Sequence, residues 1–106
     1  MKKTRGIEHK RLLSIANNYK FSQQRIKDIK RKTPLSDSQK AILNLYENYV
    51  KHIETVLGEF NLLDQCILDR EYFAPFPKGW WMEVYPRSTF YRLRLGASRK
   101  FLELFK

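Results

Sequence analysis

The longest hydrophobic pattern in the chain runs from residue 42 to residue 60. Its apolar residues recur at steps of three or four, the period of one face of an α-helix. They are Ile42, Leu45, Tyr46, Tyr49, Val50, Ile53, Val56, Leu57 and Phe60. Just before them, Ser36 and Gln39 have the spacing of a capping box, which satisfies two backbone N–H groups of a first helical turn. The pattern predicts a long helix with a wide apolar stripe that packs on two neighbouring elements.

Residues 7–32 also follow a helical period, but the pattern is weak near its middle. Asn17 and Asn18 are poor helix formers, and Ser22 could cap a new helix. One long helix and two helices with a joint near Phe21 therefore both fit. We expect residues 1–6 to be a frayed basic arm, and Pro34 to end the helical segment. The apolar positions of this segment are Leu12, Ile15, Ala16, Tyr19, Ile26 and Ile29.

Two shorter helices are predicted after residue 60. Asn61 and Asp64 offer a cap for a helix over residues 62–72, with Leu63, Ile67 and Phe73 facing inward. The prolines at positions 75 and 77 indicate a turn. Residues 78–85 then predict a short helix. It carries Trp80, Trp81 and Val84, and we expect at least one of the tryptophans to pack in the core.

The last helical segment covers residues 86–105 and begins with Pro86, which suits a first helical position. At about 100° per residue, one stripe faces a core, and Ser88, Tyr91 and Arg99 fall on the opposite face with Arg92 on its flank. The stripe consists of Phe90, Leu93, Ala97, Phe101 and Leu104. Together with residues 78–85, this segment predicts a helix-turn-helix whose second helix reads DNA.

These elements predict an all-α fold, a small helical bundle of about four to six helices ending in a C-terminal helix-turn-helix. The chain has 106 residues, which is the size of one domain. Within this single domain, residues 1–35 form a basic N-terminal helical arm in our prediction. Residues 36–106 form the helical core, with the helix-turn-helix at about 61–105.

The positive charge is concentrated at the two ends of the chain. The net charge is +10 overall; residues 1–32 carry +9, residues 33–73 carry −4 and residues 74–106 carry +5. Such segregation favours a polyanionic partner, although solubility alone is the simpler alternative.

The sequence lacks the residues that several classes of protein require. The two histidines, His9 and His52, have no Cys, His or carboxylate at ligand spacing, and no phosphate-binding glycine loop or nucleophile elbow occurs. We therefore predict a protein that is not an enzyme and uses no cofactor or metal. Its apolar runs are too short to span a membrane. A single cysteine, Cys66, is expected to be a buried packing thiol, and its lack of an intrachain partner favours a cytoplasmic location.

Three segments of the C-terminal half resemble the late-gene transcriptional activators of phages of the ArpU and RinA type, which are themselves similar to region 4 of sigma-70 factors. The first runs from Ile53-Glu54-Thr55-Val56-Leu57 through Cys66-Ile67-Leu68-Asp69-Arg70-Glu71-Tyr72-Phe73. The second is Arg87-Ser88-Thr89-Phe90-Tyr91-Arg92-Leu93, and the third is Ala97-Ser98-Arg99-Lys100-Phe101. The resemblance implies a sigma-region-4-like fold in which Arg87, Ser88, Tyr91 and Arg92 read bases.

We therefore expect a sequence-specific DNA-binding transcriptional regulator of phage or mobile-element type, whose partner is double-stranded DNA. The candidate DNA-binding residues are Arg87, Ser88, Tyr91, Arg92, Arg94 and Arg99. The candidates for phosphate contacts are Lys27, Lys30, Arg31, Lys32, Lys78 and Lys100.

The alternative function is a protein-interaction module that binds an RNA polymerase subunit or self-associates as a homodimer. Leu95 and Leu102 suggest it, because both fall away from the apolar stripe of the last helix, where a DNA-binding face would tolerate few leucines. Both could instead pack on the N-terminal helix. RNA binding through the basic ends is a third, weaker alternative.

Overall fold

The computed structural model describes residues 2–32 and 34–105, with side chains from residue 6 onward. The described chain folds into helices and turns without a strand, so the predicted all-α fold is confirmed. The elements in chain order are α1 (Lys2–Lys30), α2 (Asp37–Gly58), α3 (Leu62–Leu68), a π-helical turn η1 (Asp69–Phe73) and α4 (Arg87–Leu104).

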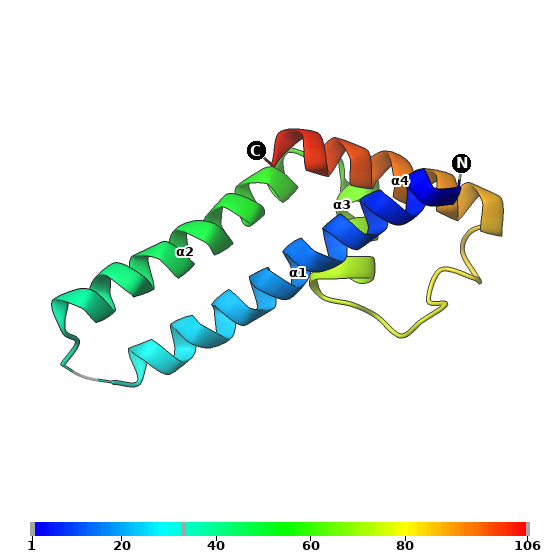
Figure 1. The fold of residues 1–106 in the computed structure, drawn as a ribbon. Helices are drawn as coiled ribbons and strands as arrows, with labels where there is room; N and C mark the ends of the chain where they lie inside the picture. Colours follow the sequence, from blue (N-terminus) through cyan, green and yellow to red (C-terminus); the bar gives the residue numbers. More distant parts are fainter. Residues whose placement is uncertain (1, 33, 106) are drawn as a thin grey trace.

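Helices α1 and α2 lie side by side as a long antiparallel hairpin (Figure 1). Of the two alternatives for residues 7–32, the single long helix is correct, and its backbone is helical from residue 2 rather than frayed. The capping box before α2 is also confirmed: Gln39 N–H donates to Ser36 Oγ, and Ser36 N–H donates to Gln39 Oε1. The molecule is elongated, with extents of 52 × 26 × 25 Å.

The predicted helix over residues 62–72 is present but changes character along its length. Asn61 caps α3 by accepting a hydrogen bond from Asp64 N–H, as expected. From residue 69 the helix widens into η1, where the N–H of Ala74 donates to the carbonyl of Asp69, five residues earlier. Of the side chains predicted to face inward, Ile67 and Phe73 are buried, whereas Leu63 is exposed.

Residues 78–85 do not form the predicted helix; they form a series of turns that ends in a bend. Gly79 has φ of 83°, a conformation that only glycine adopts at little cost and that interrupts a right-handed helix. Pro86 further disfavours a helical conformation at the residue before it. The expected packing of at least one tryptophan is confirmed, because Trp81 is buried and Trp80 is half-buried, while Val84 is exposed.

Helix α4 crosses the end of the hairpin and packs on α1, α2 and α3 (Figure 1). Its buried face differs from the predicted stripe at several positions. Phe90, Ala97 and Phe101 are buried as expected, but Leu104 is exposed. Ser98 and Leu102 are buried instead, because α1 covers a second side of the helix.

The core lies at the end of the molecule where the five elements meet. Its largest fully buried side chains are Tyr72, Phe90, Phe101, Leu12, Ile53, Ile67 and Leu68. The predicted stripe of α2 is therefore only half right: Ile53, Val56 and Leu57 are buried, whereas Ile42 and Leu45 are exposed. Cys66, expected to be buried, is only half-buried at the side of α3.

Candidate nucleic-acid interface

The first turn of α4 is positioned by aromatic packing beneath it. Phe90 is fully buried and stacks on Trp81, with ring centroids 4.4 Å apart and an interplanar angle of 6°. Trp80 meets the same ring edge to face, with centroids 5.7 Å apart. Because Phe90 is held inward, the opposite side of α4 faces solvent, and Arg87, Ser88 and Arg92 are exposed there.

All four predicted base-reading side chains lie around one open hollow on this outer side of α4. The hollow has a volume of about 700 Å³ and is lined by Arg87, Ser88, Tyr91, Arg92 and Leu95. These positions are spaced as i, i+1, i+4, i+5 and i+8, so they form one continuous face of the helix. Neither Arg87 nor Arg92 is in an ion pair with any described residue.

The N-terminus of α4 has a positive electrostatic character of its own. Pro86 occupies the N-cap position without a side-chain hydrogen bond to the first turn, and that turn contains no acidic residue. The first N–H groups of the helix therefore keep their capacity to donate, and the helix dipole adds a partial positive charge at the same place.

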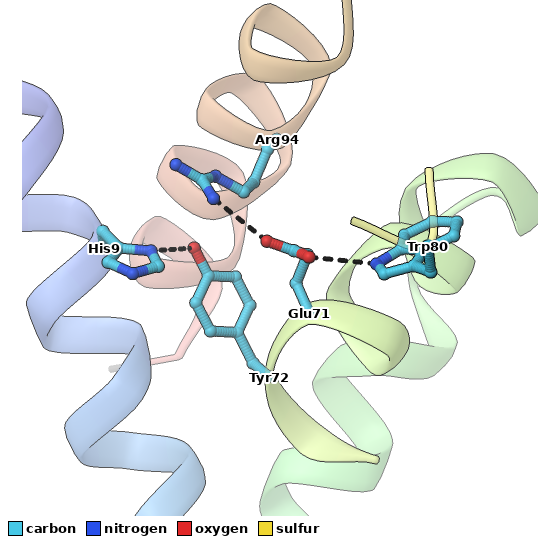
Figure 2. A network of polar contacts seen from close by, with 5 residues as sticks. All are labelled: His9, Glu71, Tyr72, Trp80 and Arg94. Atoms are coloured by element: carbon cyan, nitrogen blue, oxygen red, sulfur yellow. Dashed lines mark hydrogen bonds and ion pairs between the residues drawn. The ribbon is translucent and has the colours of Figure 1, made fainter. Parts of the chain in front are cut away.

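Arg94, a fifth predicted DNA contact, does not line the hollow and is turned toward η1. Its Nη1 donates to Glu71 Oε2 at 3.0 Å, and the Nε1 of Trp80 donates to the other carboxylate oxygen at 3.0 Å (Figure 2). The pair is largely shielded, with 24% of the Arg94 side chain and 15% of the Glu71 side chain exposed. Arg94 thus fastens α4 to η1 in this structure, a role that the sequence did not indicate.

Arg99 is engaged in a similar way with α1. Its Nε donates to Glu8 Oε2 at 3.0 Å, although about half of the arginine side chain stays exposed. The two ion pairs join α4 to its neighbours on either side, through Glu71 on η1 and Glu8 on α1.

A titratable pair next to Arg94 closes the joint between α1 and η1. His9 Nδ1 and Tyr72 Oη form a hydrogen bond of 2.8 Å (Figure 2). Burial, and then the positive charge of Arg94, lower the pKa of His9, while Glu71 acts in the opposite direction. Burial raises the pKa of Tyr72. Both groups are therefore neutral at pH 7.

Sequence reasoning missed Glu8, His9, Glu71 and Tyr72, because no motif joins residues so far apart in the chain.

Four of the six predicted phosphate-contacting residues lie far from the hollow. Lys27, Lys30, Arg31 and Lys32 lie at the far end of the hairpin, opposite the start of α4 along the long axis (Figure 1). Lys30 pairs with Glu47 at 3.3 Å, and Arg31 lies 3.9 Å from Asp28.

The other two candidates lie elsewhere. Lys78 is exposed in the connection before α4, and the ammonium group of Lys100 lies 5.1 Å from the ring centre of Phe60.

Neither a metal cluster nor a membrane span was found among the described residues. Within residues 2–32 and 34–105, no three His, Cys, Asp or Glu side chains come together in a way that could hold a metal ion. In the same part of the chain, every helix is too short or too polar to cross a bilayer.

No protein-family model, curated protein or solved structure matches the chain.

Proposed function

We propose that the outer face of α4 binds duplex DNA and that the protein is a sequence-specific transcriptional regulator in the cytoplasm. The observation that carries the proposal is the hollow bordered by Arg87, Ser88, Tyr91 and Arg92. Guanidinium groups bind guanine edges through two hydrogen bonds, and short hydroxyl groups bind phosphates and bases. The resemblance to ArpU- and RinA-type activators selects the same four residues.

In this proposal, α4 is the reading helix and the α3–η1 unit supports it from behind. The connection over residues 74–86 takes the place of the short turn of a helix-turn-helix. The uncapped N-terminus of α4 would meet a phosphate group, which accepts hydrogen bonds from backbone N–H groups and is attracted by the helix dipole. Arg94 and Arg99 act as supports for the helix, since each already binds a carboxylate.

The test compares an arginine of the hollow with a lysine at the opposite end of the molecule. A preferred site is first selected from random duplex DNA. Arg92→Ala should then weaken binding to that site by roughly 1–3 kcal/mol and weaken binding to scrambled DNA much less. Lys27→Ala is the matched control, because Lys27 is exposed at the far end of α1 and would contribute attraction without sequence information.

Equal effects of Arg92→Ala on both DNA molecules would contradict the assignment of a reading helix. Failure of the wild-type protein to bind any duplex at low salt would contradict DNA binding altogether. The melting temperature of Arg92→Ala should match that of the wild type, since the side chain is exposed and has no ion pair with a described residue.

A protein-interaction module remains the second candidate, on a surface other than the one first considered. Leu102 is buried and Leu95 half-buried, so neither offers a docking face. Exposed apolar side chains lie instead on the hairpin, where Phe21 is 58% and Leu45 69% exposed. They border a hollow of about 310 Å³ together with Asn18, Ser22, Tyr46 and Tyr49.

The two candidates are separated by Leu45→Glu, which places a charge in the hollow of the hairpin without touching α4. If the protein is an interaction module, Leu45→Glu loses self-association in sedimentation experiments or loses binding to RNA polymerase. In that case neither the wild type nor the variant binds DNA. If the protein reads DNA through α4, Leu45→Glu binds the selected site as the wild type does.

A further inference from the structure

A polar cavity lies between α1, η1 and α4, beside the joint drawn in Figure 2. Its volume is about 150 Å³, and it is partly open to solvent. Side chains from all three elements line it: Glu8, His9, Tyr72, Tyr91, Arg94, Leu95 and Ser98. Tyr91 and Leu95 also line the hollow on the outer face of α4, so the cavity lies directly behind the proposed DNA-binding face.

Two buried polar atoms of this lining have no hydrogen-bond partner among the described residues. One is the hydroxyl oxygen of Ser98, a residue that is only 2% exposed; it lies close enough to the Tyr72 hydroxyl to oppose the rise that burial causes in the pKa of that tyrosine, but the two groups do not have the geometry of a hydrogen bond. The other is Oε1 of Glu8, whose second oxygen accepts the hydrogen bond from Arg99. A buried polar group that lacks any partner destabilises a fold, so such groups are nearly always satisfied by protein or by ordered water.

The charges around the cavity select a neutral ligand. Glu8 is paired with Arg99 and Glu71 is paired with Arg94, so the two carboxylates and two guanidinium groups cancel. A bound ion would enter this site without a counter-charge and would lose its hydration. The unpartnered atoms need one donor for the carboxylate oxygen and either a donor or an acceptor for the hydroxyl group. A small neutral molecule that both donates and accepts meets these needs.

We propose that the cavity is a hydration site, in which ordered water molecules bridge Glu8 Oε1 on α1 to Ser98 Oγ on α4. One water needs only about 10–15 Å³ of such space, so the cavity can hold a small cluster. The bridge joins the same two helices as the Glu8–Arg99 pair. Together they fix the back of α4 while its outer face stays open, and this holds whether or not α4 binds DNA.

The test is the change in stability caused by Ser98→Ala, which has opposite signs depending on whether the hydroxyl group is bound to water. If the hydroxyl is bound to water, its removal breaks a bridge between α1 and α4, and stability falls both in the wild type and in a Tyr72→Phe background, where the neighbouring hydroxyl is absent. If the hydroxyl has no partner, its removal relieves a desolvated polar group, and stability rises. Alanine also favours a helix more than serine does, so this gain must be measured separately. Ser14→Ala supplies it, because Ser14 is exposed within α1.

Under the proposal, Ser98→Ala melts about 4–8 °C below Ser14→Ala, the shift for one lost hydrogen bond in a domain of this size. A high-resolution crystal structure of the wild type should also show one ordered water within about 3.2 Å of Ser98 Oγ and one within about 3.2 Å of Glu8 Oε1, either the same molecule or two that are hydrogen-bonded to each other. The proposal is wrong if Ser98→Ala melts at or above Ser14→Ala, or if the crystal structure shows no water bound to either atom.

Discussion

The two ends of the long hairpin have similar sequence patterns and very different surroundings. At the inner end, α1 and α2 are covered by α3, η1 and α4, and Leu12, Ile53 and Phe101 are fully buried. In the outer arm, formed by residues 20–30 and 37–48, only two helices meet (Figure 1). Ser22 and Ile29 are the arm's buried residues, while Ile42 and Leu45 are exposed.

This difference shows what a hydrophobic period does and does not report. The stripe continues unchanged along α2 from Ile42 to Leu57 and correctly indicates a helix with one apolar face, while its last residue, Phe60, follows the end of the helix. Burial of that face, however, needs a further element to cover it. Helix α4 supplies the cover at the inner end, where Tyr49 meets Phe105, the residue that follows α4, and it does not reach farther along the arm.

The largest expected contrast between the two ends is in core packing. Phe101→Ala should lower the free energy of unfolding by roughly 3–5 kcal/mol, because a fully buried aromatic ring is deleted and leaves a cavity. Leu45→Ala should change it by less than about 0.5 kcal/mol, since the side chain is already mostly in water. Urea unfolding monitored by circular dichroism measures both. Comparable losses would mean that the arm is covered in solution, for example by a second copy.

The next contrast concerns carboxylates at the two ends. Glu71→Ala removes the partner of both Arg94 and the Trp80 N–H, two donors in shielded surroundings, and should cost roughly 1–3 kcal/mol. Glu47→Ala removes only the exposed pair with Lys30 and should cost about 0–1 kcal/mol.

A double-mutant cycle between Glu71 and Arg94 sharpens this comparison. The coupling energy between the two residues should be clearly larger than that between Glu47 and Lys30, because water screens the second pair more strongly. Equal coupling energies would show that shielding at η1 adds nothing to the strength of the ion pair.

Local signals in the sequence predicted most of the helices and their starts. The capping box at Ser36 and the cap at Asn61 are short-range hydrogen bonds, so neighbouring residues suffice to specify them. The prediction of a helix over residues 78–85 was wrong because of a local feature that the hydrophobic pattern does not show. One residue, Gly79, takes a positive φ that apolar spacing does not reveal.

In the candidate site too, features set by local geometry could be predicted from the sequence, and features set by distant contacts could not. Arg87, Ser88, Tyr91 and Arg92 come together because helical geometry alone places them on one face, and this could be predicted. The roles of Arg94 and Arg99 could not, since their partners Glu71 and Glu8 are 23 and 91 residues away in the chain. Such contacts depend on how α1 and η1 are placed in three dimensions, and no period in the sequence encodes that placement.

The smallest expected effect is a dependence of stability on pH that arises at the inner end. Burial and the charge of Arg94 lower the pKa of His9 in the folded protein below the 6.5 of a free histidine. As pH falls through 6.5, the unfolded chain therefore binds a proton that the folded chain resists, and the free energy of unfolding decreases. Above about pH 7.5 this residue is almost entirely neutral in both states, so its contribution is nearly constant there.

Replacement of this histidine isolates the effect. We expect the free energy of unfolding of the wild type to decrease between about pH 7.5 and pH 5.5, and the decrease to be smaller in His9→Gln. The effect is ranked last because His9 is a single, partly buried group. Glutamine retains a polar group near the Tyr72 hydroxyl but does not titrate in this range, so the two proteins differ in slope more than in stability at pH 7.5. Identical slopes would show that His9 gains its proton as easily in the folded protein as in the unfolded chain. The joint between α1 and η1 would then be more hydrated than its contacts suggest.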